Sequence, residues 1–164
     1  MRNPCRLGYR STAVLAATLL VAACSPAGPS HDETAAPVKH IDAAELRAWW
    51  QSDRDVVVLD VRTEKEFRED GRAPGAVLQT WSYNGKDAEV NALFVDEIQR
   101  RFSVDQTLVV LCSHGMRATQ ATRALDSQAG FTSVYVFDGG YEGHHMKGYP
   151  AGDGWKAAEL PIDD

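Results

Sequence analysis

Residues 107–117 read Thr-Leu-Val-Val-Leu-Cys-Ser-His-Gly-Met-Arg. The first five are apolar or β-branched with no polar alternation, which predicts a strand covered on both faces. A helix is predicted to begin at Met116 and to stop at Gly130. Cys112 therefore lies between a buried strand and a helix N-terminus, where N–H groups stabilise a thiolate, the nucleophilic form of cysteine. The alternative is a buried, inert structural cysteine.

The residues that follow Cys112 are predicted to form an anion-binding loop: Ser113, His114, Gly115, Met116 and Arg117. Backbone amides of such a loop can point inward at the sulfur. Gly115 allows the tight curve without a clash of Cβ, and Arg117 adds a fixed positive charge. His114 either lends charge to the thiolate or faces solvent, and the sequence leaves both interpretations open.

Strand and helix patterns alternate along the chain. Besides 107–111, strands are expected at 38–41, 56–60, 76–78 and 134–137, and helices at 43–52, after Thr63, at 88–102 and at 116–129. This alternation predicts an α/β fold with an open parallel sheet and helices on both faces.

Asp60 and Cys112 each follow a run of buried strand residues. Because ligands of open α/β sheets bind outside the carboxyl ends of the strands, both residues are expected on the rim that carries the site. Asp60 and Arg62 are predicted to support the site through hydrogen bonds and a charge pair. The alternative for this pair is simple capping of the next turn.

Two other segments carry residue types that occur in functional sites. Trp81-Ser82-Tyr83-Asn84 either lines the mouth of the site or packs as core and loop. The adjacent His144 and His145 could suggest a soft metal, but neighbouring histidines on a helix do not share a face. No metal site is predicted there, and a surface helix is expected after the Gly139-Gly140 turn.

Four ordered segments resemble motifs of the rhodanese (sulfurtransferase) superfamily. They are Leu59–Phe67 against "LDVR-x-x-x-E-[FY]", Gly71–Val77 against "GHIPGA-[IV]", the Cys112 loop, and Phe137–Gly140 with Trp155–Pro161 against "L-x-GG … W-x-x-x-G-x-P". Two departures stand out: Arg72-Ala73 replaces His-Ile, and Glu159 replaces Gly. Neither departure involves the predicted nucleophile, so they bear on local packing.

The resemblance implies a rhodanese-like fold and sulfur transfer without a cofactor. Cys112 would take a sulfane sulfur from a small donor such as thiosulfate and pass it, as a persulfide, to a thiol or cyanide acceptor. The alternative within the family is a non-catalytic or low-turnover sulfur carrier or sensor module.

A cysteine phosphatase or arsenate reductase is the rival from outside that superfamily. Those enzymes also use a loop from Cys to Arg, but theirs has one more residue between the two than Ser113 to Met116 supplies here. A shorter loop makes a smaller cradle, which suits a sulfur atom better than a tetrahedral phosphate. No Asp is placed by a recognisable motif as a general acid either.

The N-terminal residues are predicted to be a targeting segment. Residues 1–23 combine a basic start with a short apolar run, as in a signal peptide, and Ala22-Ala23-Cys24 resembles the end of a bacterial lipobox. We expect lipidation of Cys24, a flexible tether at 24–37 and one domain at 38–162. The protein would then be anchored to a membrane on the periplasmic side of the cell envelope. The alternative is ordinary signal cleavage without lipid.

Charge and cysteine content narrow the function further. The chain has 17 basic and 23 acidic residues and a formal charge of −6, which becomes −9 without Arg2, Arg6 and Arg10. This balance argues against a nucleic-acid partner.

Of the three cysteines, Cys5 would leave with the signal peptide and Cys24 would carry lipid, so Cys112 would be a lone thiol. An unpaired thiol in an exported domain suggests reactivity. The sequence predicts no oligomeric state.

Overall fold

The computed structural model describes residues 37–84, 89–144 and 151–163. The predicted signal peptide, the predicted lipidation site at Cys24 and most of the predicted tether lie outside the described residues. None of the described helices combines the length and the apolar character needed to cross a membrane.

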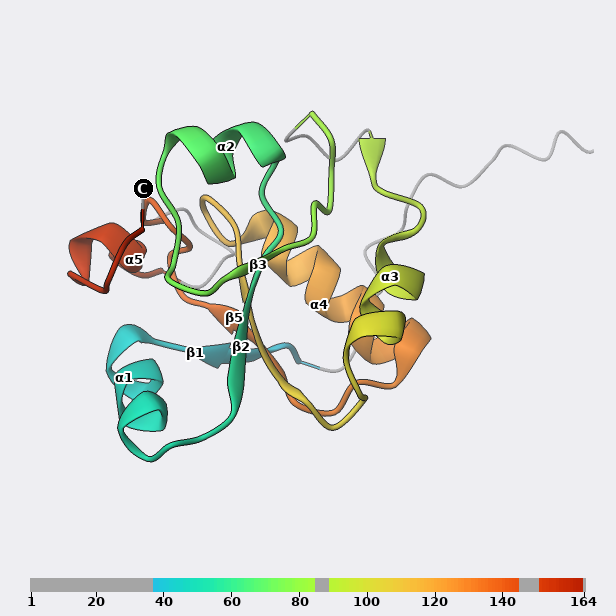
Figure 1. Cartoon of the computed structure of the whole chain (residues 1–164), viewed down its shortest axis with the longest axis horizontal. Coiled ribbons are helices and arrows are strands. Elements are labelled where there is room, and N and C mark those ends of the chain that lie inside the picture. The colour runs from blue at the N-terminus through green and yellow to red at the C-terminus, as the bar shows by residue number, and fades with distance from the viewer. Residues whose placement is uncertain (1–36, 85–88, 145–150, 164) are drawn as a thin grey trace, which may run out of the picture. The chain divides into compact units, whose positions relative to one another are not determined.

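Five parallel strands form one sheet in the order β1-β5-β4-β2-β3 (Figure 1). Their bounds are Lys39–Ile41, Val56–Asp60, Val77–Leu78, Thr107–Leu111 and Val134–Phe137 for β1 to β5. The helices are α1 Ala43–Gln51, α2 Glu64–Glu69, α3 Phe94–Arg101, α4 Met116–Ala129 and α5 Gly154–Ala157. The predicted α/β class and parallel sheet are confirmed.

Two apolar clusters cover the two faces of the sheet, with α3 and α4 on one side and α1 and α5 on the other (Figure 1). Strand β4 shows why both faces are covered, because successive side chains point to opposite faces. Leu108 and Val110 pack in the cluster with α3 and α4, whereas Val109 and Leu111 pack in the other. Cys112 continues the first series, so its side chain points toward α4.

Helix α4 follows the predicted boundaries closely. It begins at Met116 after Gly115, whose φ of 92° lies in the left-handed region, and ends at Gly130 with φ of 69°. Glycine takes this conformation at little cost, which explains the sharp turn from β4 into the helix.

The prediction for the third helix is wrong at its start. The expected helix at 88–102 begins only at Phe94, and Leu93, just before it, is 54% exposed. The side chain of Asn91 accepts a hydrogen bond from the Leu93 N–H at 3.0 Å, and its backbone carbonyl accepts one from Phe94. A polar turn therefore replaces the first part of the expected helix.

The expected surface helix after the Gly139-Gly140 turn is also not observed in the described part of that segment. Gly143 has a φ of 92°, and His144 pairs with Gly152 in a short antiparallel bridge. The His144 side chain is buried rather than on a surface. His145 lies outside the described residues.

The two departures from the family motifs are accommodated locally. Glu159 has a φ of 54°, the conformation in which a glycine costs least, which gives a physical reason for Gly at this position in the resembled family. Arg72 pairs through its backbone with Asp163, and its guanidinium lies over the ring of Phe67.

Candidate active site

The Cys112 thiol lies at the carboxyl end of β4 and is 1% exposed. Its Sγ accepts hydrogen bonds from the N–H groups of Gly115, at 3.1 Å, and Ala118, at 3.4 Å. Both donors belong to the start of α4, where unsatisfied N–H groups and the helix dipole favour negative charge. The loop can therefore hold an anionic sulfur through backbone groups.

The burial of Cys112 opposes the predicted stabilisation of its thiolate by the loop. Burial raises the pKa of the Cys112 thiol above its ordinary value, and the Ala118 N–H and the charge of Arg117 offset this only in part. The physical reason is the loss of water around the sulfur, which penalises the charged form. The thiol is thus mainly protonated at neutral pH when no donor is bound.

Arg117 is directed toward α2 by Glu66. The guanidinium donates to Glu66 Oε2 at 2.8 Å and Oε1 at 2.6 Å, and also to the Ser113 hydroxyl at 2.8 Å. Ser113 in turn donates to Glu66 Oε1 at 2.6 Å. These three side chains form a closed polar network beside the Cys112 loop.

Burial alone would raise the pKa of Glu66, but hydrogen bonds from Arg117, Ser113 and Thr63 outweigh it and hold that pKa well below its usual range. Glu66 is therefore ionised at neutral pH. The pKa of Arg117 is raised despite burial, chiefly by the hydrogen bond to Glu66. The positive charge of Arg117, which the sequence predicts to act on the Cys112 thiolate, is consequently also paired with the Glu66 carboxylate.

The turn at Gly139-Gly140 holds the backbone of the loop from the opposite side. The N–H of Tyr141 donates to the Cys112 carbonyl at 2.8 Å, and the N–H of Glu142 donates to the Ser113 carbonyl at 2.9 Å. A Cβ on Gly140 would lie 2.5 Å from the Cys112 carbonyl oxygen. The close approach therefore requires glycine at this position.

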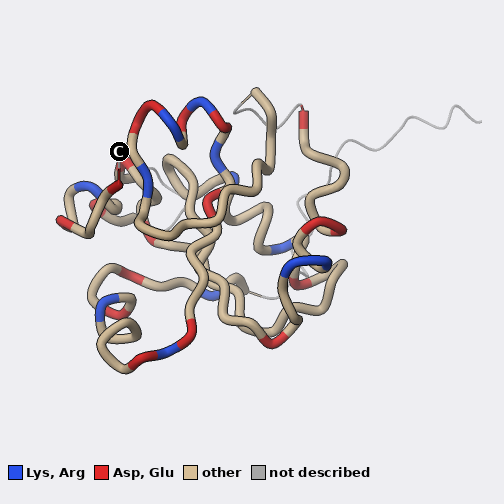
Figure 2. The backbone as a smooth tube through the Cα atoms, viewed as in Figure 1, with Lys and Arg blue, Asp and Glu red and all other residues tan. Residues whose placement is uncertain are grey.

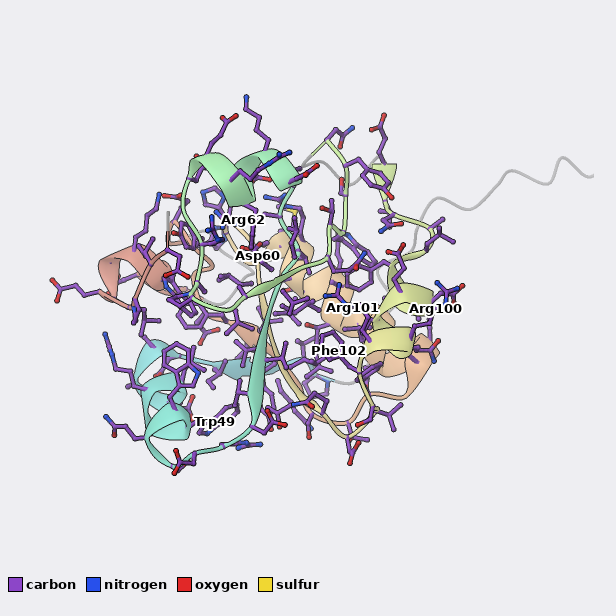
Figure 3. The ribbon with its side chains drawn as sticks, viewed as in Figure 1. Trp49, Asp60, Arg62, Arg100, Arg101 and Phe102 are labelled. Carbon is purple, nitrogen blue, oxygen red and sulfur yellow. The ribbon has the colours of Figure 1, made fainter. Side chains whose placement is uncertain are left out.

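Asp60 and Arg62 form a buried pair at the end of β2 (Figure 3). Arg62 also donates to the carbonyl of Gly71 at 2.7 Å, and its guanidinium lies 4.1 Å from the ring centroid of Tyr141. Burial raises the pKa of Asp60, and the contacts with Arg62 counteract this only partly. The pair thus contacts the residue whose N–H holds Cys112, which fits the predicted supporting role and leaves it untested.

The remaining predicted loop residues take different positions. His114 is exposed, and its ring lies 6.4 Å from that of His144, while Met116 is half-buried.

Trp81 packs edge-on against Phe94 in the core, so the described contacts favour a packing role for Trp81 rather than a place at the mouth of the site. Within the described ranges, no group of three His, Cys, Asp or Glu side chains is arranged to hold a metal ion.

Sequence reasoning missed Glu66 as a site residue. In the structure Glu66 also completes a capping box with Thr63, whose N–H donates to Glu66 at 2.9 Å. The available signal was the Glu in the resembled "LDVR-x-x-x-E-[FY]" motif. A link between α2 and a loop 47 residues further on has no local sequence signature.

Comparison with known proteins decides the family. Residues 42–147 match the Rhodanese-like domain. The chain belongs to the rhodanese-like domain family. It is 34% identical over 93 residues to "Thiosulfate sulfurtransferase 16, chloroplastic" of Arabidopsis thaliana, a match that covers 56% of this chain and 76% of that protein.

Two further similarities agree with membership of the rhodanese-like family. The chain is 30% identical over 118 residues to "Thiosulfate sulfurtransferase GlpE" of Glaesserella parasuis, covering 71% of this chain and 87% of that protein. The crystal structure of Rv0390 from M. tuberculosis matches with a TM-score of 0.56 and 28% identity, covering 76% of this chain and 98% of that one. A single rhodanese-like domain accounts for these matches.

Proposed function

We propose that this chain is a sulfurtransferase that moves a sulfane sulfur from a donor such as thiosulfate to a thiol or cyanide acceptor. The observation that carries the proposal is the Cys112 sulfur, buried and bonded by the N–H groups of Gly115 and Ala118. The similarity to proteins named thiosulfate sulfurtransferase supports the same reaction.

The reaction proceeds in two steps through covalent catalysis. The Cys112 thiol first loses its proton to water, and the thiolate attacks the outer sulfur of thiosulfate. The S–S bond of the donor breaks, sulfite leaves with the bonding electrons, and Cys112 retains a persulfide. An acceptor such as cyanide then attacks the terminal sulfur, which yields thiocyanate and restores the thiolate.

The loop contributes charge stabilisation to both steps. Negative charge resides on sulfur before and after each transfer, and backbone N–H groups fixed by the helix start need no reorganisation to receive it. Ser113 and Arg117 keep the loop in shape through Glu66. His114 is exposed beside the loop, where it can meet an acceptor.

Steady-state kinetics test this proposal. With thiosulfate and cyanide varied together, wild-type protein should form thiocyanate with the parallel double-reciprocal plots of a ping-pong reaction, and Cys112→Ser should form none. A phosphatase substrate such as p-nitrophenyl phosphate should not be hydrolysed. Thiocyanate formation by Cys112→Ser at the wild-type rate would refute the role of Cys112, while a stable persulfide without turnover would favour the sulfur carrier.

We also propose that the protein is exported and anchored to a membrane through lipid on Cys24. The support is the sequence of residues 1–24 alone, with its basic start, short apolar run and Ala22-Ala23-Cys24 end. Bacterial lipoproteins carry more than one acyl chain, which gives stable attachment where a single chain does not.

A further inference from the structure

Glu66 connects the Cys112 loop to α2 through the side chains of Ser113 and Arg117. It receives two hydrogen bonds from Arg117 and one from Ser113, and it is the acceptor for the N–H and hydroxyl of Thr63 as well. Only about a quarter of the Glu66 side chain is exposed, 26%, against 9% for Arg117. This is a partly buried, bidentate ion pair, the geometry in which Arg and carboxylate bind most strongly.

The same pairing recurs in the residues that support the loop. Arg62 binds Asp60, and Lys156, next along the chain from buried Trp155, binds Glu142 at 2.7 Å. Acidic and basic residues also follow one another along α2, where Arg68 pairs with Glu64 (Figure 2). Each of these described cations thus has a carboxylate partner.

This charge balance matters for the sulfur donor. Thiosulfate carries two negative charges into a buried site whose sulfur must itself become a thiolate to react, and a buried charge without compensation is costly. A donor with one negative charge brings half as much charge into the buried site. A free guanidinium would compensate the second charge, but Arg117 is already bound to Glu66.

Building on the sulfurtransferase function proposed above, we propose that Glu66 is a positioning residue that selects the sulfur donor by its charge. Because Glu66 binds Arg117, that guanidinium is not available to a donor, and the Cys112 loop favours sulfane donors with one negative charge or none over a dianion. The expected donor class is therefore an organic persulfide or a thiosulfonate.

Two donors that react in the same way but differ in charge can test this proposal. The Cys112 thiolate attacks the outer sulfur of thiosulfate, a dianion, or of benzenethiosulfonate, a monoanion. In each case one S–S bond forms as the donor's S–S bond breaks, and the bonding electrons leave with sulfite or benzenesulfinate. Cys112 carries the same persulfide afterwards, so only the charge and bulk of the donor differ.

The test compares Glu66→Gln with Glu64→Gln in the full chain. Glutamine also completes a capping box, so Glu66→Gln keeps the Thr63 cap while removing the charge that binds Arg117. Glu64→Gln removes the same charge from an exposed position on the same helix. The measured quantity is the ratio of kcat/KM for thiosulfate to kcat/KM for benzenethiosulfonate, with persulfide formation as the first half-reaction.

Glu66→Gln should raise this ratio by about tenfold and move the midpoint of the pH–rate profile down by about one unit, since a freed cation favours the charged forms. Glu64→Gln should change neither. In the wild type, added salt should raise the ratio, because screening relieves repulsion of a dianion more than of a monoanion. An unchanged ratio in Glu66→Gln, or a wild-type ratio that falls with salt, would overturn the proposal.

Failure of the donor-selection proposal is distinct from failure of the sulfurtransferase function. If neither donor leaves a persulfide on wild-type Cys112, the proposed function itself fails. If both donors do and the ratios behave otherwise than stated, only the role of Glu66 is refuted. Should Glu66→Gln not fold, the salt dependence of the wild-type ratio decides the matter alone.

Discussion

Replacing Gly140 with Ala tests whether the Gly139-Gly140 turn holds the Cys112 loop in place. The new Cβ would lie 2.5 Å from the Cys112 carbonyl oxygen and 2.7 Å from backbone atoms of Ser113, and the residue would keep a φ of 65°. The left-handed conformation costs about 1–2 kcal/mol for a residue with Cβ. Forcing extra atoms into a packed region costs about 1–3 kcal/mol more. We therefore expect a loss of roughly 2–5 kcal/mol in the free energy of unfolding.

Gly130→Ala is the matched control, because Gly130 has a similar φ of 69° but nothing within 4 Å of its Cβ position. It should lose only the conformational part, about 1–2 kcal/mol. Urea denaturation followed by tryptophan fluorescence gives both values, provided that the slope with urea is unchanged. Persulfide formation by folded Gly140→Ala should also be slower, since the bonds from Tyr141 and Glu142 to the loop would lengthen. Equal losses in the two variants, with a wild-type rate for Gly140→Ala, would refute this reasoning.

Four other outcomes are expected. Asp60→Asn should lower the free energy of unfolding by about 3–5 kcal/mol, because it leaves the buried charge of Arg62 without its carboxylate; a urea midpoint equal to that of wild type would contradict this. The rate of persulfide formation should keep rising with pH beyond the usual range of a thiol, because burial raises the pKa of Cys112; a plateau already at neutral pH in stopped-flow measurements would argue against it. The hydrogen bonds that hold the pKa of Glu66 low, despite its burial, stabilise the fold above its usual pKa of 4.5 and should be lost as the pH falls. Glu66→Gln should therefore show a flatter decline of Tm in acid. Cys24→Ala should block lipid labelling and release the protein from membranes, whereas membrane-free wild type with an unmodified N-terminus would exclude the anchor.

The sheet and the nucleophile loop could be predicted from sequence because their signals are local. The apolar run of β4, the break at Gly115 and the stop at Gly130 each act within a few residues, and the structure begins and ends α4 at those positions. Successive side chains along β4 point to opposite faces, which places Cys112 on the same face as Leu108 and Val110. These features needed no knowledge of distant contacts.

Features set by contacts between distant segments escaped prediction. Glu66 looks like an ordinary capping residue in sequence, and its bonds to Arg117 and Ser113 exist only after α2 folds over the loop. The start of α3 was misplaced because the Asn91 side chain binds the Leu93 N–H and favours a turn. The burial of the Cys112 sulfur, which raises the pKa of the thiol, is likewise not visible in the motif, which shows only the helix start.

The most direct test of the central claim is the intact mass of the purified protein after incubation with thiosulfate. We expect a gain of one sulfur, about 32 Da, located on Cys112, reversed by cyanide and absent in Cys112→Ser. A wild-type mass that stays unchanged with thiosulfate, benzenethiosulfonate and polysulfide alike would contradict the claim that Cys112 is a sulfur-transferring nucleophile.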